Sequence, residues 1–301
     1  MKTSAALGFF DGVHLGHRRV IETAVQLAGD CLDPAVFTFT MRAKRPAGKK
    51  DAGLLTAPEE KIRLLRQMGI ERVYCPDFSQ FHDFSGEEFV QKILIEALDA
   101  AVVVCGEDFR FGKGAACGKD DLQRLCEEKG IRCVVLKEVT DHGQKISSTR
   151  VRQALLAGDM EEAAHLLGRH YTVSYPVQKG KQLGRKMHFP TINQPFPDDV
   201  LVPRYGVYAA VAQIGETSYP TVCNIGLRPT VEADETPRAE TYIMDFSGDL
   251  YGQNVPVRLL SFLREEQIFS SVEDLQEQIG KDAEKARKIA KKALQPGCAV
   301  V

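Results

Sequence analysis

From residue 1 to about residue 168, short apolar runs alternate with segments whose apolar residues recur at helical spacing. The apolar runs, which we expect to form buried strands, are 4–7, 35–39, 72–75, 101–105 and 132–136. The segments with helical spacing are 18–28, 58–68, 86–97 and 118–129. Alternating strands and helices predict an α/β domain, in which helices cover both faces of a parallel sheet. Ligands of such domains bind at the carboxyl ends of the strands.

After Gly168 the pattern changes to strand following strand. The spans with strand character are 171–177, 207–214, 219–223, 240–246 and 255–262. This order predicts an antiparallel sheet or a small β-barrel. No helical spacing returns until Ser271, and one long helix is then expected over 272–294, with Ser270 and Glu273 as its capping box. The predicted domains are therefore 1–168 and 169–301.

Length and composition agree with two globular domains. The chain has 301 residues, of which 44% are hydrophobic and 27% charged. Its formal net charge of −2 gives no support for general binding to nucleic acid or to a membrane surface. No apolar run has the length of a membrane span, so we expect a cytoplasmic protein. The eight cysteines are scattered without a Cys-x-x-Cys pair, which favours buried reduced thiols over a metal site.

Residues 8–17, GFFDGVHLGH, stand between the first predicted strand and the first predicted helix. A glycine-rich turn before a helix binds anions, because unpaired N–H groups and the helix dipole point at the ligand. His14 and His17 are three residues apart, so both imidazoles would project from one face of the helix start. Gly8 and Gly12 let the backbone approach a ligand closely. This stretch predicts a nucleotide phosphate site.

Two further segments of the first half have residues suited to the same site. Residues 106–118, GEDFRFGKGAACG, combine glycines with aromatic and basic side chains directly after a predicted strand. They would hold an aromatic ring and phosphates, or form only a solvated strand-to-helix loop. Residues 146–152, ISSTRVR, offer three hydroxyl groups and two arginines at a helix start. An ordinary N-cap is the alternative for this second segment.

Residues 179–193, KGKQLGRKMHFPTIN, predict a cationic loop suited to phosphates. On the extended chain that follows the loop, Thr191 and Asn193 point the same way. Two neutral oxygens of this kind can ligate Mg²⁺ that phosphates and water already hold. A polar β-turn after Pro190 is the alternative.

Two more positions of the second half carry candidate chemistry. The turn-rich segment 224–230, NIGLRPT, contains Arg228. Glu240 opens a predicted strand among apolar neighbours and is the candidate general base towards a hydroxyl, or else a solvated residue at a strand start. We interpret the basic second half of the C-terminal helix as a solvated face and not as a nucleic-acid surface.

Together, GFFDGVHLGH, GEDFRFGKGA and ISSTRVR resemble the adenylyltransferase module of prokaryotic bifunctional riboflavin kinase/FAD synthetases. FPTIN, NIGLRPT and AETYIMDFSGDLYG are similar to the riboflavin kinase module of that family. The family implies a Rossmann-like nucleotidyltransferase domain, then a small Greek-key barrel with a long C-terminal helix. It implies that the barrel phosphorylates riboflavin to FMN with ATP and Mg²⁺ or another divalent metal. The first domain would transfer AMP from a second ATP to FMN, giving FAD and pyrophosphate.

The resemblance also implies roles for single residues. His14 and His17 match paired histidines that steady the α-phosphate, and Glu240 matches the base that activates the riboflavin hydroxyl. With the residues argued above, the nucleotide-binding candidates are Gly8, Phe9, Asp11, Gly12, Gly106, Arg110, Ser147, Ser148, Thr149, Arg152, Gly180, Gly184 and Arg185. The metal ligands would be Thr191 and Asn193, and the flavin-binding candidates are Arg228, Arg264 and Phe269.

The chain departs from the family pattern in three places. The family usually has a Pro-His-Pro turn near the flavin side of the transferase site. Here residues 39–44 read FTMRAK, and the departure runs from Thr40 to Lys44. His188 stands where a glycine is usual, and Ile192 where an alanine is usual. The alternatives are an enzyme with one degraded half, or a non-catalytic flavin or nucleotide sensor. Because a sensor has less need of His14, His17, Asn193 and Glu240 together, we favour the bifunctional enzyme, and a homo-oligomer is compatible with it.

Overall fold

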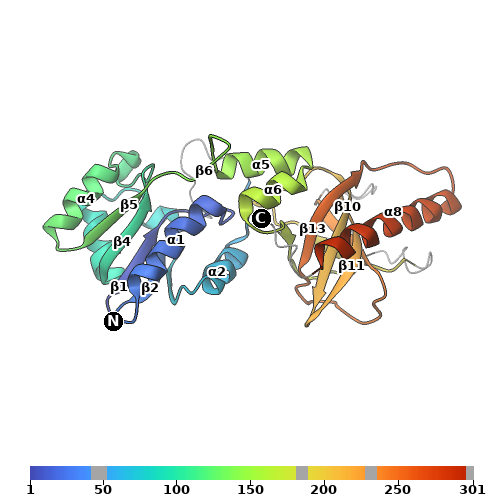
Figure 1. Cartoon of the computed structure of the whole chain (residues 1–301), viewed down its shortest axis with the longest axis horizontal. Coiled ribbons are helices and arrows are strands. Elements are labelled where there is room, and N and C mark those ends of the chain that lie inside the picture. The colour runs from blue at the N-terminus through green and yellow to red at the C-terminus, as the bar shows by residue number, and fades with distance from the viewer. Residues whose placement is uncertain (42–52, 181–188, 228–235, 296–301) are drawn as a thin grey trace. The chain divides into compact units, whose positions relative to one another are not determined.

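The computed structural model describes residues 1–41, 53–180, 189–227 and 236–295 (Figure 1). Contacts divide the chain into two compact units, Met1–Ser148 and Thr149–Val301. Helices α5 (Ser148–Ala157) and α6 (Met160–Leu167) are grouped almost entirely with the second unit. The boundary predicted after residue 168 would assign both helices to the first domain instead.

The first unit is built on a five-stranded parallel sheet, which confirms the α/β prediction. Its strands, in the order β3-β2-β1-β4-β5, are β1 (Thr3–Leu7), β2 (Asp33–Phe37), β3 (Arg72–Tyr74), β4 (Ala100–Gly106) and β5 (Arg132–Leu136). Its helices are α1 (Leu15–Ala28), α2 (Pro58–Gln67), α3 (Gly86–Phe89), which continues as a π-helical segment (Val90–Ala97), and α4 (Lys119–Glu128). Two 3₁₀ turns (Phe78–Gln80 and Lys113–Ala115) and a short hairpin of β6 (Thr140–Asp141) and β7 (Gln144–Lys145) complete it.

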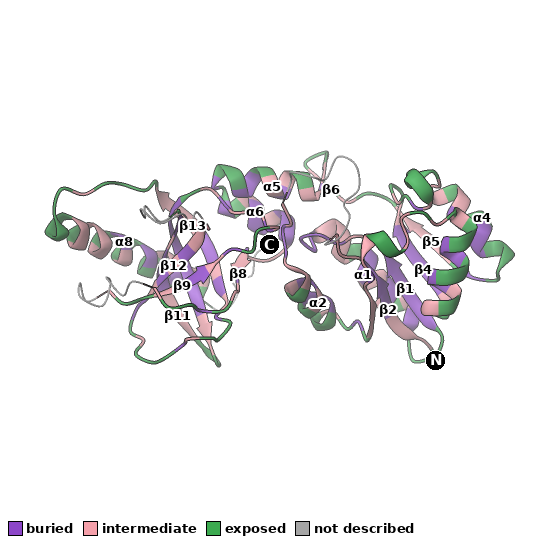
Figure 2. Ribbon diagram, turned by 180° about the vertical axis from the view of Figure 1, so that it is seen from behind, coloured by how far each residue is buried: buried purple, intermediate pink, exposed green. Residues whose placement is uncertain are grey.

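Helices cover both faces of this sheet. Ile21 of α1 and Leu65 of α2 pack with Val36 on one face. On the other face, Phe37 packs with Leu122 of α4 and with the π-helical segment. Figure 2 shows the central strands β1 and β4 as largely buried between these layers. Only the ends of such strands remain open to a ligand, so the loops at the carboxyl ends of the strands are the candidate binding region.

The second unit contains a curled antiparallel sheet, which confirms the prediction of an antiparallel sheet after Gly168. Its strands, in the order β8-β13-β10-β11-β12-β9, are β8 (Thr172–Val173), β9 (Thr191–Pro195), β10 (Gly206–Ile214), β11 (Thr217–Gly226), β12 (Arg238–Ile243) and β13 (Val257–Arg264). A bridge between Gln178 and Asn193 joins the chain after β8 to β9, at the opposite edge of the sheet. Helix α8 (Val272–Ala293) packs on one face through Ala286, against Val207 and Val222.

Three details differ from the sequence expectations. Regular pairing in the span 171–177 is limited to β8, because Pro176, which has no N–H group, makes only an isolated bridge with Asn254. Strand β9 was not expected as a strand, since its apolar pattern is broken by Thr191 and by polar residues. The cap of α8 is Ser271, whose Oγ accepts from the N–H of Asp274 at 3.1 Å, and not Ser270.

The cysteines in the described part of the chain are all free thiols, as their scattered positions in the sequence predict. Among them, Cys105, Cys126 and Cys223 are fully buried. Burial raises the pKa of the Cys223 thiol to about 12, which keeps it protonated in the core of the second unit.

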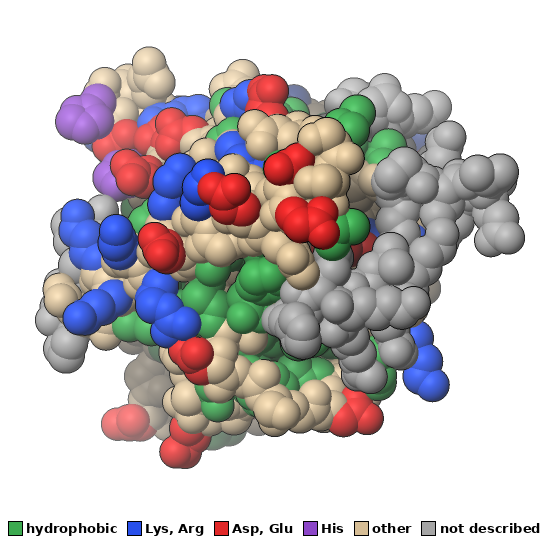
Figure 3. Space-filling view, turned by 90° about the vertical axis from the view of Figure 1, so that its right-hand side faces the viewer, with side chains coloured by type: hydrophobic (Ala, Val, Ile, Leu, Met, Phe, Trp, Pro, Cys, Tyr) green, Lys and Arg blue, Asp and Glu red, His purple; other side chains and the backbone are tan. Residues whose placement is uncertain are grey.

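Figure 3 shows acidic and basic side chains intermixed around hydrophobic ones on one face of the molecule. Within the described ranges, no helix combines the length and the hydropathy that a bilayer crossing requires.

Candidate active sites

The turn 8–13 after β1 has an unusual backbone. Phe10, Gly12 and Val13 all have positive φ, of 53°, 84° and 44°. For residues other than glycine this conformation is strained, and it persists only where the surroundings hold it. A Cβ on Gly8 would lie 2.8 Å from the ring of Phe10, so a side chain at Gly8 would displace this ring. The turn is therefore a fixed structure at the carboxyl end of the central strand β1.

His14 and His17 lie together at the start of α1. Their ring centroids are 3.6 Å apart with an interplanar angle of 19°, so the imidazoles stack. His14 is the N-cap, and its Nδ1 accepts the backbone N–H of His17 at 3.3 Å. Because Nδ1 acts as the acceptor, a neutral His14 ring carries its hydrogen on Nε2. A Cβ on Gly16 would come within 3.1 Å of the His14 ring, so the glycine leaves room for this stack.

Asp11 connects the turn with two other segments. Its side chain is 2% exposed and accepts the backbone N–H groups of Leu55 at 2.8 Å and Thr56 at 3.3 Å. Its carbonyl oxygen accepts the hydroxyl of Ser148 at 3.0 Å. The hydroxyl of Ser148, the first residue of α5, thus contacts the turn, and the nucleotide contacts expected of the segment 146–152 stay predictions. The carboxylate of Asp11 therefore fixes the turn to the segment at Leu55 and Thr56.

The structure also gives positions for the other candidates of the first half. Gly106 ends β4, and the Arg110 guanidinium donates to the carbonyl of Ala115 at 3.1 Å within its own loop. Ser147 precedes helix α5. Thr149 and Arg152 lie in α5 beyond the division between the units. The nucleotide contacts proposed for these residues stay predictions.

One residue that the sequence did not single out is Lys61 of α2. Its side chain is buried, with 4% exposed, and its ammonium donates to the carbonyl oxygens of Phe9 and Phe39 and to the hydroxyl of Thr38. The sequence around it, PEEKIRLL, has the pattern of an amphipathic helix start, in which a lysine is normally exposed. Only tertiary packing shows that this lysine reaches the ends of β1 and β2.

In the second unit, the candidates Asn193 and Glu240 belong to a row of paired residues that crosses four strands. Asn193 of β9 pairs with Glu240 of β12, Glu240 pairs with Asn224 of β11, and Asn224 pairs with Val207 of β10. Directly opposed residues of an antiparallel sheet have their side chains on the same face. Two positions before Asn193, Thr191 shares this face because side chains alternate along a strand. Thus the predicted metal ligands and the predicted base do lie side by side.

A cavity of about 390 Å³ opens on this face. It is lined by Glu240, Thr191 and the predicted flavin-binding residues Arg264 and Phe269, together with Asn224, Glu266 and residues from the start of α8. The guanidinium of Arg264 is bound by the buried carboxylate of Asp282 at 2.8 Å, and it lies 5.8 Å from the ring of Phe269. Arg264 therefore holds the cavity wall, since its charge is already paired within the protein.

The amide of Asn224 adds a second link in that wall. Its Nδ2 donates to Oε1 of Glu266 at 3.0 Å. A Cβ on Gly226 would lie 2.3 Å from the same Glu266 oxygen, so only glycine allows the carboxylate to reach this place. Neither Asn224 nor Asp282 was expected from the sequence, because their role depends on strand register and on the packing of α8.

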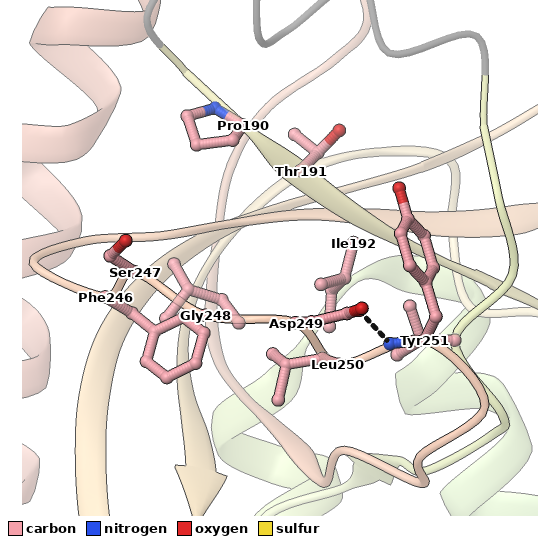
Figure 4. A pocket seen from close by; sticks show the side chains of 11 residues that line it. Pro190, Thr191, Ile192, Phe246, Ser247, Gly248, Asp249, Leu250 and Tyr251 are labelled. Carbon is pink, nitrogen blue, oxygen red and sulfur yellow. Dashed lines mark hydrogen bonds between the residues drawn. The ribbon is translucent and has the colours of Figure 1, made fainter.

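A second cavity, of about 470 Å³, lies beside the loop 246–251 (Figure 4). The loop follows β12 and bends back through the bond from the backbone N–H of Tyr251 to Oδ1 of Asp249, at 3.0 Å. Thr191 and Ile192 line this cavity, and the Lys179 ammonium lies 5.8 Å from the ring of Tyr251. Thr191 consequently lines this cavity as well as the one that contains Glu240. The sequence of this loop is part of the family motif at 239–252 and predicts no pocket there.

Some candidates lie outside the described residues. They are the loop residues Gly184 and Arg185, Arg228 of NIGLRPT, and, among the departures from the family pattern, His188 and the residues from Arg42 to Lys44. Gly180 is the last residue described before the loop. Of the departures that are described, Thr40 donates its hydroxyl to Asp77 at 3.0 Å, and Ile192 is half-buried at the second cavity.

Both units match enzymes of flavin metabolism. The FAD synthetase family model matches residues 1–150, and the riboflavin kinase family model matches residues 167–290. The chain is 36% identical to a bifunctional riboflavin kinase/FMN adenylyltransferase of Bacillus subtilis, over 95% of this chain and 92% of that protein. The corresponding Escherichia coli protein is also 36% identical, over 93% and 90%. The chain belongs to the family of bifunctional riboflavin kinase/FMN adenylyltransferases.

A solved structure extends this likeness to the fold. A Streptococcus pneumoniae protein, described as a macrolide-efflux protein, matches with a TM-score of 0.81 and 33% sequence identity. The match covers 95% of this chain and 94% of that one. The architecture of both units therefore recurs in an experimentally solved relative.

Proposed function

We propose that the second unit phosphorylates riboflavin to FMN and that the first unit adenylylates FMN to FAD. The observation that carries the kinase assignment is the position of Thr191, which lines both cavities, while Glu240 lines one of them. Phosphoryl transfer requires two substrates that meet in line at one phosphorus atom, so two pockets with a shared wall suit this reaction.

In the kinase step, the flavin ring occupies the cavity with Phe269, and ATP occupies the cavity beside the loop 246–251. Glu240 accepts the proton of the riboflavin 5′-hydroxyl as its oxygen attacks the γ-phosphorus. The bond from the γ-phosphorus to the bridging oxygen breaks, and ADP leaves. The Arg264–Asp282 pair and the Asn224–Glu266 hydrogen bond keep the flavin cavity in shape.

The donor set fits a divalent metal that arrives with the nucleotide. Among the described residues, no group of three or more His, Cys, Asp or Glu side chains could hold a metal ion alone. Thr191 and Asn193 would add neutral oxygens to a Mg²⁺ ion held largely by phosphates, which neutralises phosphate charge during transfer. Glu240 lies beside Asn193 in the sheet and completes an oxygen-rich row.

In the transferase step, the turn 8–13 and the N-terminus of α1 bind the phosphates of ATP. A phosphate oxygen of FMN attacks the α-phosphorus, and pyrophosphate leaves. His14 donates from Nε2 and His17 stands beside it, so the pair stabilises charge on the α-phosphate without a covalent intermediate. The strand order of the first unit supports the Rossmann-like assignment, and the Greek-key assignment of the second unit rests on the family resemblance.

The test is incubation with riboflavin, ATP and Mg²⁺, followed by chromatographic separation of the flavins. We expect FMN and then FAD. FMN without FAD would eliminate the transferase, and tight flavin binding without product would support the sensor alternative.

Two variants separate the sites. His17→Ala should accumulate FMN without FAD, because only the first site loses a catalytic group. Glu240→Ala should lose the kinase reaction by about 10²- to 10⁴-fold and still make FAD from added FMN. Loss of both activities in either variant, with the fold intact, would contradict the two-site assignment.

A further inference from the structure

Lys61 is a buried cation at the carboxyl ends of two parallel strands. It lies in the first turn of α2, and its side chain is 4% exposed. Burial of an ammonium group is costly unless hydrogen bonds replace the lost water. A lysine retained here must therefore have a well-defined set of partners.

The partners come from the segments that follow β1 and β2. The Nζ atom donates to the carbonyl oxygen of Phe9 at 3.1 Å, to Oγ1 of Thr38 at 2.9 Å and to the carbonyl oxygen of Phe39 at 3.1 Å. All three distances are those of ordinary hydrogen bonds from an ammonium donor. The same Nζ lies 4.7 Å from the centroid of the Phe9 ring, a favourable cation–π distance.

The carbonyl group of Phe9 is held from two sides. It accepts the ammonium of Lys61 and also the hydroxyl of Thr38, at 2.8 Å. In a trans peptide the carbonyl and the next N–H point in opposite directions, so this arrangement aims the N–H of Phe10 away from Lys61. It also fixes the entry to the strained turn, in which Phe10 has a φ of 53°. A positive charge on the carbonyl side polarises the peptide and makes its N–H a stronger donor.

The peptide group between Phe39 and Thr40 is hydrogen-bonded on both sides. Its carbonyl oxygen accepts from Lys61, and the following N–H, that of Thr40, donates to the carbonyl of Pro76 at 3.0 Å. The rings of Phe9 and Phe39 lie 4.7 Å apart. Lys61 thus joins the turn after β1 to the segment after β2 and holds their two aromatic rings together.

We infer that Lys61 is a positioning residue of the transferase site. Its ammonium fixes the peptide between Phe9 and Phe10 and so holds the turn 8–13 in the shape that receives the phosphates of ATP. It acts through this backbone, because its ammonium donates to the carbonyl oxygens of Phe9 and Phe39 and to the hydroxyl of Thr38. The inference rests on the assignment of adenylyl transfer to the first unit.

The main test is Lys61→Met, which removes the charge and keeps the length of the side chain. We expect kcat for FAD formation from FMN to fall by about 10- to 100-fold, because small displacements of catalytic groups have effects of this size. The KM for ATP should change much less, since an aimed N–H group matters most as charge develops in the transition state. Riboflavin phosphorylation by the same protein serves as the internal measure of an intact fold.

Lys92→Met is the matched control. Lys92 also lies on a helical segment of the first unit, and its Nζ is 4.4 Å from the ring of Phe84. Its ammonium, however, pairs with the exposed Glu88 and holds no strand end. This variant should keep both activities of the wild type.

Thr38 provides a second pair of variants that keeps the lysine. Thr38→Val removes the hydroxyl that contacts both Lys61 and Phe9, and should lower the transferase kcat several-fold. Thr38→Ser retains the hydroxyl and should behave like the wild type.

Wild-type transferase kinetics in folded Lys61→Met would overturn the inference. Equal losses of kinase and transferase activity would also overturn it, because they indicate a general folding defect. If Lys61→Met does not fold, the Thr38 pair decides, and equal kcat values for the valine and serine variants would then reject the positioning role. Failure of the wild-type protein to form FAD from FMN would instead reject the proposed function, before any variant is compared.

Discussion

The two candidate sites obtain their chemical groups from different parts of the backbone architecture. In the first unit, the strand β1 is buried over all five residues, and the site begins only where the strand ends. In the second unit, β12 alternates between buried and half-buried residues, and the site lies on one face of the strand itself. Parallel sheets covered on both faces leave only their edges and ends for binding, whereas an antiparallel sheet can present a whole face.

Because of this difference, the first candidate site is formed mainly by backbone groups and the second mainly by side chains. The first site depends on a backbone turn with three positive φ values and on a helix start, supported by the buried carboxylate of Asp11. The second site depends on side chains in strand register, such as Glu240 beside Asn193. We therefore expect backbone substitutions to damage the first site most, and changes in side-chain pairing to damage the second.

The largest effect is expected from Asp282→Asn, which breaks the wall of the flavin cavity. Asp282 is 1% exposed and pairs with Arg264, so its loss leaves a cation without its partner inside the protein. The free energy of unfolding should fall by roughly 3 kcal/mol, measured by chemical denaturation. The control is Asp245→Asn, because Asp245 pairs with Arg287 at the surface and should contribute far less. Equal destabilisation by the two substitutions would refute the importance of burial here.

The next largest effect is expected from Gly12→Ala, which tests the backbone side of the comparison. Gly12 has a φ of 84°, and a Cβ there would lie 2.8 Å from Cδ1 of Leu55. Both features displace the turn, so FAD formation from FMN should fall by about 10²-fold while riboflavin phosphorylation is unchanged. Gly29→Ala is matched for positive φ, at 51°, with no neighbour within 4 Å, and should retain activity. Transferase activity of Gly12→Ala equal to that of Gly29→Ala would show that the turn tolerates a side chain.

The smallest effect concerns the pH dependence of the second unit. Burial, with a contribution from the charge of Arg258, lowers the pKa of His170 below its ordinary value of 6.5. As the pH falls through that ordinary value, the unfolded chain binds a proton that the folded chain does not, so stability decreases towards acid. His170→Gln should reduce this loss, measured as residual kinase activity after heating at several pH values. His142→Gln, at a side chain that is 94% exposed, should retain the wild-type dependence, and an identical loss in both variants would contradict the assignment.

The sequence predicted the parts of both sites that depend on local order along the chain. The motif GFFDGVHLGH has glycines and histidines at a strand-to-helix junction, and the stacked rings of His14 and His17 follow from that spacing. The alternation of strands and helices also predicted the two kinds of sheet. Such features are determined by neighbours a few residues apart.

The remaining features depend on residues that are distant in sequence. Lys61 reaches Phe9 across the fold, and Asp282 reaches Arg264 because α8 packs on the sheet. Ser270 and Ser271 are both suitable caps, and only the extended backbone of Ser271 decides between them. Periodicity carries no information on such tertiary partners, so a buried lysine and an exposed one look the same in the sequence.

The departure at Ile192 has a structural consequence that the sequence did not specify. Its side chain contributes to the wall of the cavity beside the loop 246–251, where the family usually has the smaller alanine. The larger side chain occupies volume in the proposed nucleotide pocket, and it leaves Thr191 and Glu240 in place. The groups proposed for the kinase chemistry are therefore retained, and we expect the substitution to act on the shape of the pocket.

The shared wall at Thr191 has a consequence for reaction order. A phosphoryl group that passes between adjoining pockets needs both pockets filled at once, and no protein nucleophile is required to carry it. Initial velocities measured against ATP at several riboflavin concentrations should then give intersecting double-reciprocal lines, the signature of a ternary complex. Occupancy of one pocket should also slow the departure of the ligand in the other, because both ligands abut the same threonine.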